Sequence, residues 1–365
     1  MYIKSIELKN FRNYEDFSIE FDQDVNLIIG KNAQGKTNLI EAVYLTSMGR
    51  SFRTSRDSDL IRFGCDTAFI RVEASKELID TRVEVMISRN SRKAIKKDGT
   101  FVRKTSQLMK NIILVVFSPE DLRIVKDEPE KRRRFIDREL AQIRPAYYNS
   151  LGSYKKALMQ RNQYLKEETI DENVLLLWDA QIVKYGAEVM RHRKRFIDEM
   201  NVFSGRIHSG ITDGAEELKI EYDPNQPYAD DSAEQEKILE EALRDSFDQD
   251  IRMRTTGRGP HKDDVKFFVN GVNVRKFGSQ GQQRTCALSL KLAELDFIRE
   301  ETGENGILLL DDVMSELDGA RREYLVRALS GIQLFITAAE VDQRLLDAYK
   351  DAKIIRIDHG RAVSE

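Results

Sequence analysis

The segment from Gly30 to Thr37 constrains the fold of this chain more than any other feature. It reads Gly-Lys-Asn-Ala-Gln-Gly-Lys-Thr and fits the phosphate-binding pattern G-x-x-x-x-G-K-[ST]. The apolar run Val25–Ile29 before it predicts a strand, and residues 35–48 after it predict a helix, which is the context that the pattern requires. An ordinary glycine-rich turn is the alternative, and this context favours a nucleotide site.

The pattern assigns roles to the residues of this loop. Glycines let the backbone wrap closely around phosphate, and the start of the following helix attracts anions. Lys36 would be catalytic through contact with the β- and γ-phosphates of ATP, and Thr37 would be a ligand of Mg²⁺. The predicted ATP-binding residues of the loop are Gly30, Lys31, Asn32, Ala33, Gln34, Gly35, Lys36 and Thr37.

A second half of the site is predicted far along the chain. Residues 306–310 read as an apolar strand that is followed by Asp311 and Asp312. Ligands bind at the carboxyl ends of strands in open α/β sheets, so Asp311 would be a second Mg²⁺ ligand. Asp312 would be the catalytic group that orients or deprotonates an attacking water. A turn that merely follows a core strand is the alternative.

The order of predicted elements indicates an α/β fold with an inserted helical segment. Residues 1–117 read as strands with one helix, and a helical segment is expected to begin at Ser118-Pro119-Glu120. Its long helices are predicted over 174–207 and 234–253. Helices at 280–300, from about 318 and at 342–349 then alternate with strands. We therefore predict one domain from residues 1–117 and 256–365, and a helical, arm-like domain over 118–255.

The charge of the chain is uneven. The 365 residues carry 59 Lys and Arg against 62 Asp and Glu, a net of −3. Residues 211–250 hold 14 acidic against three basic residues, a local net of −11, so the rest of the chain carries +8. Nucleic acid is attracted by the local electrostatic field of a basic region and not by the net charge of the whole chain. The near-neutral total therefore does not exclude DNA binding. Two cysteines and only short apolar runs predict a cytoplasmic protein without disulfides or membrane spans.

Further motifs carry a family resemblance. Ser279-Gln280-Gly281-Gln282 precedes a predicted helix, which taken alone is a helix cap, and Ser315-Glu316-Leu317-Asp318 follows the paired acids. Together with the loop, these motifs resemble ABC-type ATPases of the DNA-repair branch related to SMC proteins. The chain is closer still to the RecF family of bacterial DNA replication and repair proteins. That likeness rests on Leu8-Lys9-Asn10-Phe11-Arg12-Asn13-Tyr14, Phe117-Ser118-Pro119-Glu120-Asp121-Leu122, Arg132-Arg133-Arg134-Phe135-Ile136-Asp137 and Gly259-Pro260-His261-Lys262-Asp263-Asp264.

The resemblance implies an ABC-type P-loop ATPase head, built from both chain ends, that binds ATP between two copies. One copy would supply the loop and paired acids, and its partner would supply the signature Ser279, Gln280, Gly281 and Gln282 in trans. Arg12 and Asn13 would lie near ATP. The implied activity is a weak, DNA-stimulated ATPase that closes as a homodimer on DNA. It would act with RecR and RecO to help load RecA at single-strand gaps.

Two departures from the ABC pattern predict slow turnover. Asp312 stands where most ABC ATPases carry glutamate, and the shorter side chain would reach an attacking water less well. Thr337-Ala338-Ala339 stands where a histidine is expected after the strand at residues 333–336.

Two basic runs are candidate DNA contacts, although such runs are commonly solvated helix faces. The candidate residues are Lys131, Arg132, Arg133, Arg191, Arg193 and Lys194. A stripe of this kind would bind single- or double-stranded DNA, or a gap junction, without sequence preference. The competing functions are an ABC-type subunit that powers a transporter and a phosphotransferase. The long helical insertion disfavours the first, and the lack of an acceptor site disfavours the second.

Overall fold

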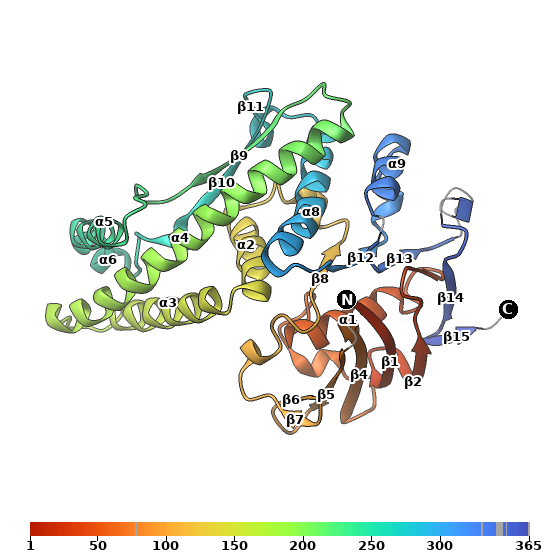
Figure 1. Cartoon of the computed structure of the whole chain (residues 1–365). Helices are drawn as coiled ribbons and strands as arrows, with labels where there is room; N and C mark the ends of the chain where they lie inside the picture. The colour runs from red at the N-terminus through yellow and green to blue at the C-terminus, as the bar shows by residue number, and fades with distance from the viewer. Residues whose placement is uncertain (77–78, 330, 341–345, 348, 364–365) are drawn as a thin grey trace. The chain divides into compact units, whose positions relative to one another are not determined.

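A computed structural model of the chain describes residues 1–76, 79–329, 331–340, 346–347 and 349–363 (Figure 1). It divides into two compact units. The first unit consists of residues 1–122 and 294–365, and the second of residues 123–293. The two chain ends thus form one unit around a long insertion, as the sequence predicts.

The first unit contains two sheets. An antiparallel sheet has the order β2-β1-β4-β5-β6-β7, and a second sheet has the order β15-β14-β3-β13-β12-β8, in which only β15 is antiparallel. The antiparallel strands are β1 (Tyr2–Phe11), β2 (Tyr14–Glu20), β4 (Thr67–Lys76), β5 (Ile79–Ser88), β6 (Ala94–Lys97) and β7 (Thr100–Phe101). The second sheet is formed by β3 (Val25–Ile29), β8 (Leu114–Phe117), β12 (Ile307–Asp311), β13 (Leu334–Ala338), β14 (Lys353–Asp358) and β15 (Arg361–Val363). The continuous apolar runs of β8 and β12 suit parallel strands that are covered on both faces.

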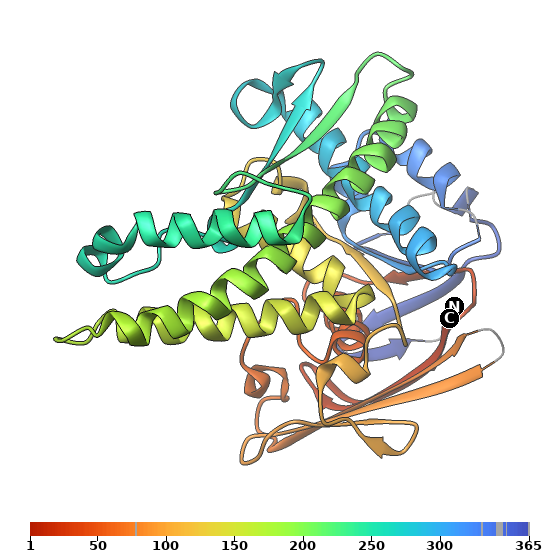
Figure 2. The same cartoon turned by 60° about the vertical axis from the view of Figure 1, so that its left-hand side comes forward.

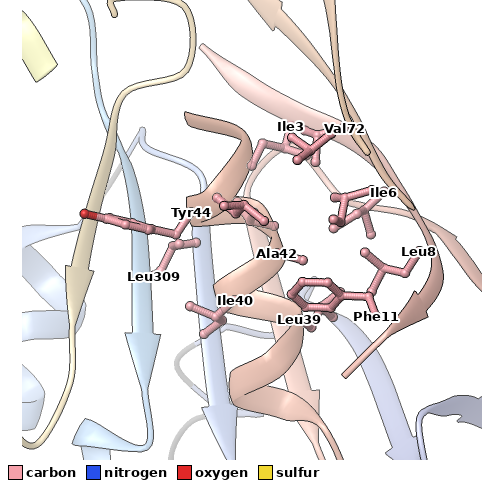
Figure 3. Close-up of a cluster of buried hydrophobic side chains, with 14 of the residues drawn as sticks. Ile3, Ile6, Leu8, Phe11, Leu39, Ile40, Ala42, Tyr44, Val72 and Leu309 are labelled. Atoms are coloured by element: carbon pink, nitrogen blue, oxygen red, sulfur yellow. The ribbon is translucent and has the colours of Figure 1, made fainter. Parts of the chain in front are cut away.

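Helix α1 (Lys36–Met48) is buried almost throughout, because it packs against both sheets. Figure 3 shows Leu39 and Ala42 of α1 on the side of Ile6 and Leu8 of β1, and Leu309 of β12 on the opposite side of the helix. Because the two sheets cover α1 on opposite sides, its sequence has no polar stripe of the kind that a surface helix shows. This packing fixes the position of the loop at the start of α1. The same unit contains α9 (Gly319–Ala328).

The second unit is mainly helical, and α3 and α4 lie side by side in both views (Figure 1, Figure 2). Its helices are α2 (Pro129–Ile143), α3 (Pro145–Tyr164), α4 (Glu172–Ile211), α5 (Ser232–Asp245), α6 (Phe247–Met253), α7 (Val274–Phe277) and the first part of α8 (Gln280–Thr302). A three-stranded sheet consists of β9 (Leu218–Asp223), β10 (Asp264–Val269) and β11 (Val272–Asn273).

The structure corrects three sequence-based expectations. The segment 256–293 belongs to the second unit instead of the ATPase domain, because β10 pairs with β9 over its whole length. Ser118 does not begin a helix, since its amide and hydroxyl donate to Asp121 in a short turn and α2 begins only at Pro129. The helix expected over 234–253 is divided at Ser246 into α5 and α6. The helix expected at 342–349 lies largely outside the described residues.

Candidate nucleotide-binding site

The loop between β3 and α1 has the backbone that its glycines predict. A Cβ atom at Gly30 would lie 2.3 Å from the carbonyl oxygen of Ile357, so no side chain fits there. Gly35 has a φ of 122°, and a Cβ atom on it would approach the side chains of Asn13 and Tyr14. Gly30 is therefore required by close packing, and Gly35 by close packing and by its left-handed backbone.

Lys36 is held inside this loop. Its side chain is 3% exposed, and its Nζ donates to the carbonyl oxygen of Gly30 over 2.7 Å and to that of Lys31 over 3.3 Å. The same nitrogen lies 4.0 Å from Asp312 Oδ2. The loop thus keeps one ammonium group at the position where the phosphate-binding pattern expects it.

Thr37, Asp311 and Thr337 form the centre of the site. Asp311 ends β12 and lies opposite Thr337 of β13 in parallel register. Asp311 Oδ1 accepts from Thr37 Oγ1 over 2.9 Å and from Thr337 Oγ1 over 3.0 Å. Burial is the main influence on Asp311 and raises the pKa of its carboxyl above the usual value, while the two hydroxyl groups oppose this shift. Sequence reasoning missed the role of Thr337, which only the strand register could have shown.

The oxygens of Thr37 and Asp311 fit a magnesium ion. Mg²⁺ prefers oxygen ligands in an octahedron with bonds of about 2.1 Å, so two neighbouring ligands lie about 3 Å apart. The distance of 2.9 Å between Thr37 Oγ1 and Asp311 Oδ1 matches that separation. A hydroxyl and a carboxylate are also the hard donors that this ion selects.

Asp312 faces a cavity beside this centre. Its φ of 53° is in the left-handed region, and its amide donates to Thr337 Oγ1 over 2.8 Å. Its side chain is 38% exposed. The cavity has a volume of about 410 Å³ and is lined by Asn32, Asp312, Met314, Ser315, Arg322, Thr337, Ala338, Ala339 and Glu340. The held backbone and accessible carboxylate allow Asp312 to orient a water molecule in this space.

Arg12 and Asn13 support the loop. The Arg12 guanidinium donates to both carboxylate oxygens of the buried Glu41 on α1, over 2.7 and 2.8 Å, and to the carbonyl oxygen of Asp59. Asn13 Nδ2 donates to the carbonyl oxygen of Gln34 over 2.7 Å. Both side chains therefore hold the loop and its helix in this structure, and direct contact with a nucleotide stays a prediction.

The signature residues Ser279, Gln280, Gly281 and Gln282 belong to the second unit, at the start of α8. Ser279 and Gln282 form a reciprocal cap, in which the Ser279 amide donates to Gln282 Oε1 over 3.0 Å and the Gln282 amide donates to Ser279 Oγ over 3.1 Å. Ser279 and Gln280 are exposed. The serine hydroxyl and the helix start are thus presented to solvent.

Comparison with known proteins identifies the family. The family model for the RecF/RecN/SMC N terminal domain matches residues 2–359. The DNA replication and repair protein RecF of Lachnospira eligens is 40% identical over 370 residues, which cover 100% of both chains. The RecF of Clostridium perfringens is 41% identical over 362 residues, 99% of each chain. The chain belongs to the RecF family.

Solved structures agree with the RecF-family assignment. The recombination mediator protein RecF bound to ATP, from the RecFOR pathway, is 36% identical over 99% of this chain and 97% of its own, with a TM-score of 0.91. An Smc head bound to the winged-helix domain of ScpA is 17% identical, covers 99% of this chain and 96% of its own, and has a TM-score of 0.57, which shows the fold alone. The predicted ABC-type ATPase head is thereby confirmed. The transporter alternative has no support, and no helix in the described part of the chain is long and apolar enough to span a bilayer.

Two predicted DNA contacts of this RecF-family chain need correction, because Arg132 and Arg193 are buried. Arg132 forms two hydrogen bonds with the carboxylate of Asp264, over 2.6 and 3.0 Å. Arg193 donates to Asp137 over 2.8 Å and to Asp263 over 3.2 Å. Both guanidinium groups are internal ion-pair partners and do not reach the protein surface. The sequence could not show this, because all four distances join residues at least 56 positions apart in the chain.

The other four predicted DNA contacts lie nearer the surface. Lys131 pairs with Asp127 over 3.0 Å and Lys194 with Asp198 over 2.6 Å. Arg133 is half-buried and donates to the carbonyl oxygen of Asp263 over 2.6 Å, and burial lowers its pKa. Arg191 is exposed. The positive charge of Lys194 is therefore partly compensated within α4, and that of Lys131 by Asp127, which lies just before α2.

Proposed function

We propose that this chain is a slow, DNA-stimulated ATPase that binds ATP and Mg²⁺ at the P-loop and closes as a homodimer on DNA. The observation that carries this proposal is the 2.9 Å contact between Thr37 and Asp311, because it joins the phosphate loop to the paired acids. The RecF structure in complex with ATP is a related precedent. The proposed setting is DNA replication and recombinational repair in the cytoplasm.

Each residue of the site has a proposed chemical role. Lys36 contacts the β- and γ-phosphates, and Thr37 and Asp311 hold Mg²⁺, which neutralises charge that develops on the phosphates. Asp312 orients the attacking water and accepts its proton. The short reach of Asp312 and the absence of histidine from residues 337–339 support slow hydrolysis.

The signature of one copy is proposed to meet the nucleotide of the other. Ser279 is exposed at the start of a helix of 23 residues, and the amide groups and dipole of such a helix favour an anion. Its Oγ accepts from the Gln282 amide, which leaves the hydroxyl hydrogen available to a phosphate oxygen. Lys36 and Ser279 would then contact the same ATP from different copies.

We further propose that DNA contacts the basic hairpin at residues 89–104 in the first unit. This segment carries seven basic residues and one acid, Asp98. Arg92, Arg103 and Lys104 are exposed, and no carboxylate of the described residues forms an ion pair with them. Lys96 lies over the ring of the exposed Phe101, at 4.7 Å from its centroid. Basic side chains without an acidic partner are better placed to bind the phosphate backbone of DNA than the lysines of α2 and α4, which already pair with acids.

The proposed protein partners follow from the family. The related RecF structure is described as part of the RecFOR pathway. By extension, RecR together with RecO would bind this chain, and RecA would be affected indirectly at single-strand gaps.

Analytical ultracentrifugation with and without ATP tests the dimer proposal. We expect ATP to convert monomer into dimer. Ser279→Arg should still bind ATP but remain monomeric, because the larger cation occupies the space of the partner's phosphate, whereas Lys36→Met should lose both properties. An unchanged ATP-bound dimer of Ser279→Arg would reject the trans site.

A further inference from the structure

Glu216 lies in the turn between α4 and β9, and neighbouring side chains fix its backbone. The Glu216 amide donates to Thr212 Oγ1 over 3.3 Å, and that hydroxyl donates to the carbonyl oxygen of His208 over 2.9 Å. The following amide, of Glu217, donates to Asn270 Oδ1 over 2.8 Å. The Glu216 carboxylate therefore extends from a backbone that is held on both sides.

His208 orients one oxygen of this carboxylate. The imidazole is fully buried on the last turn of α4, and its Nε2 lies 3.1 Å from Glu216 Oε2. An ionised carboxylate can only accept, so the ring donates through Nε2. Its Nδ1 lies 3.2 Å from Ser289 Oγ on α8. His208 thus connects the end of α4 with α8.

The second oxygen of Glu216 reaches the signature. Glu216 Oε1 accepts from Gln282 Nε2 over 2.9 Å. The other end of the same amide, Gln282 Oε1, accepts the backbone N–H of Ser279. One side chain therefore bridges Glu216 and the signature serine, and the amide of Gln282 cannot rotate without breaking one of these contacts.

We propose that Glu216 and His208 are positioning residues for ATP hydrolysis. They hold Gln282, and through it Ser279, in the orientation in which the signature meets the phosphates bound by the partner copy. Neither residue touches ATP in this arrangement. The inference rests on the proposed trans site, and it adds two residues, 208 and 216, that lie outside every motif of the sequence.

A mixing experiment distinguishes this role from a merely structural one. Glu216→Ala alone should hydrolyse ATP about 10-fold more slowly, because a hydrogen bond to a charged group is lost. Its own P-loop is intact, so ATP binding should be unchanged. Lys36→Met should be inactive by itself, because its loop binds no ATP, but its signature is intact. In a mixed dimer closed by the single ATP on Glu216→Ala, the P-loop of Glu216→Ala meets the intact signature of Lys36→Met. The mixture should therefore hydrolyse ATP several-fold faster than the two proteins measured separately.

Three further variants complete the test. Glu216→Gln keeps an acceptor for Gln282, so it should retain more activity than Glu216→Ala, and it replaces the alanine variant in the mixture if that variant does not fold. Glu217→Ala removes the neighbouring acid and should have no effect.

A mixture of Ser279→Arg with Lys36→Met is the reference, because it tests directly whether an intact signature in one copy restores hydrolysis at the P-loop of the other. If the reference pair recovers activity and the Glu216 pair does not, the positioning role is overturned. If neither pair recovers, the proposed trans site itself fails.

Discussion

Thr337 Oγ1 donates to Asp311 Oδ1 over 3.0 Å and accepts the amide of Asp312 over 2.8 Å, so one hydroxyl holds both acids of the nucleotide site. It belongs to the stretch 337–339, where the ABC pattern expects a histidine. A hydroxyl this short cannot extend into the cavity as a histidine would. It acts instead by holding Asp311 and Asp312 through its two hydrogen bonds.

Thr337→Val should impair hydrolysis more than ATP binding. Valine has nearly the same shape but leaves the Asp312 amide without its acceptor, which should also lower the free energy of unfolding by about 1–2 kcal/mol. Steady-state ATPase rates and chemical denaturation measure the two effects. Thr337→Ser, which keeps the hydroxyl, is the matched control, and equal activity of the valine and serine variants would contradict the role of the hydrogen bonds.

Asp312→Asn should separate binding from hydrolysis. Asparagine keeps the size of the side chain but cannot accept a proton from water, so turnover should decrease by about 100-fold or more. The ATP-bound dimer should then persist longer. Its lifetime can be measured from the rate at which the dimer dissociates after dilution. Turnover equal to that of the wild type would show that another group acts on the water.

Neutralising the basic hairpin should weaken DNA binding without affecting ATP binding. The variant replaces Arg92, Lys96, Arg103 and Lys104 with glutamine. Each lost phosphate contact should flatten the slope of log affinity against log salt by about 0.9 on duplex DNA. The matched control replaces Lys131, Arg134, Lys194 and Arg195, each of which pairs with an acid four residues away. A larger loss of affinity in the control would place the DNA surface on the second unit.

The stability of the second unit should decrease in mild acid because of His261. Burial lowers the pKa of His261 to about 4, and its Nε2 donates to the carbonyl oxygen of Thr256 over 2.9 Å. Between a pH of about 6.5 and 4, the unfolded chain binds a proton at His261 that the folded chain excludes. The contribution of His261 to the free energy of unfolding is therefore complete above this range and is lost as the pH falls through it. The free energy of unfolding should decrease by roughly 2 kcal/mol from about pH 7 to about pH 5. Denaturation of His261→Gln at both pH values should lack this part of the decrease.

The sequence predicts those parts of the site that are encoded in contiguous segments. The loop from Gly30 to Thr37 and the pair Asp311–Asp312 each follow a single apolar strand, so their position at the end of a sheet can be inferred locally. Thr337 could not be assigned in this way, because its partner depends on the register between β12 and β13. Glu216 is hidden for the same reason, since Gln282 is 66 residues away.

The errors in the second unit also have non-local causes. A run of arginines resembles a solvated or DNA-binding face when its acidic partners are unknown. Arg132 meets Asp264 across 132 residues of sequence, and Arg193 meets Asp263 across 70. The domain boundary was misplaced at residue 255 because the pairing of β9 with β10 cannot be read from either strand alone.

The position of β3 has a consequence for synthesis on the ribosome. Its two neighbours in the sheet, β13 and β14, come from residues 334–358, and the loop residue Gln34 accepts from the amides of His359 and Gly360 across more than 320 residues. The nascent strand therefore emerges with both edges unpaired and stays so until nearly all of these 365 residues have been translated. Unpaired apolar strands of this kind are prone to aggregation, so the emerging chain is exposed to it until the partner strands have been synthesised. An incomplete chain that ends before β13 would also lack the surroundings that shape its phosphate loop, and would compete poorly for ATP.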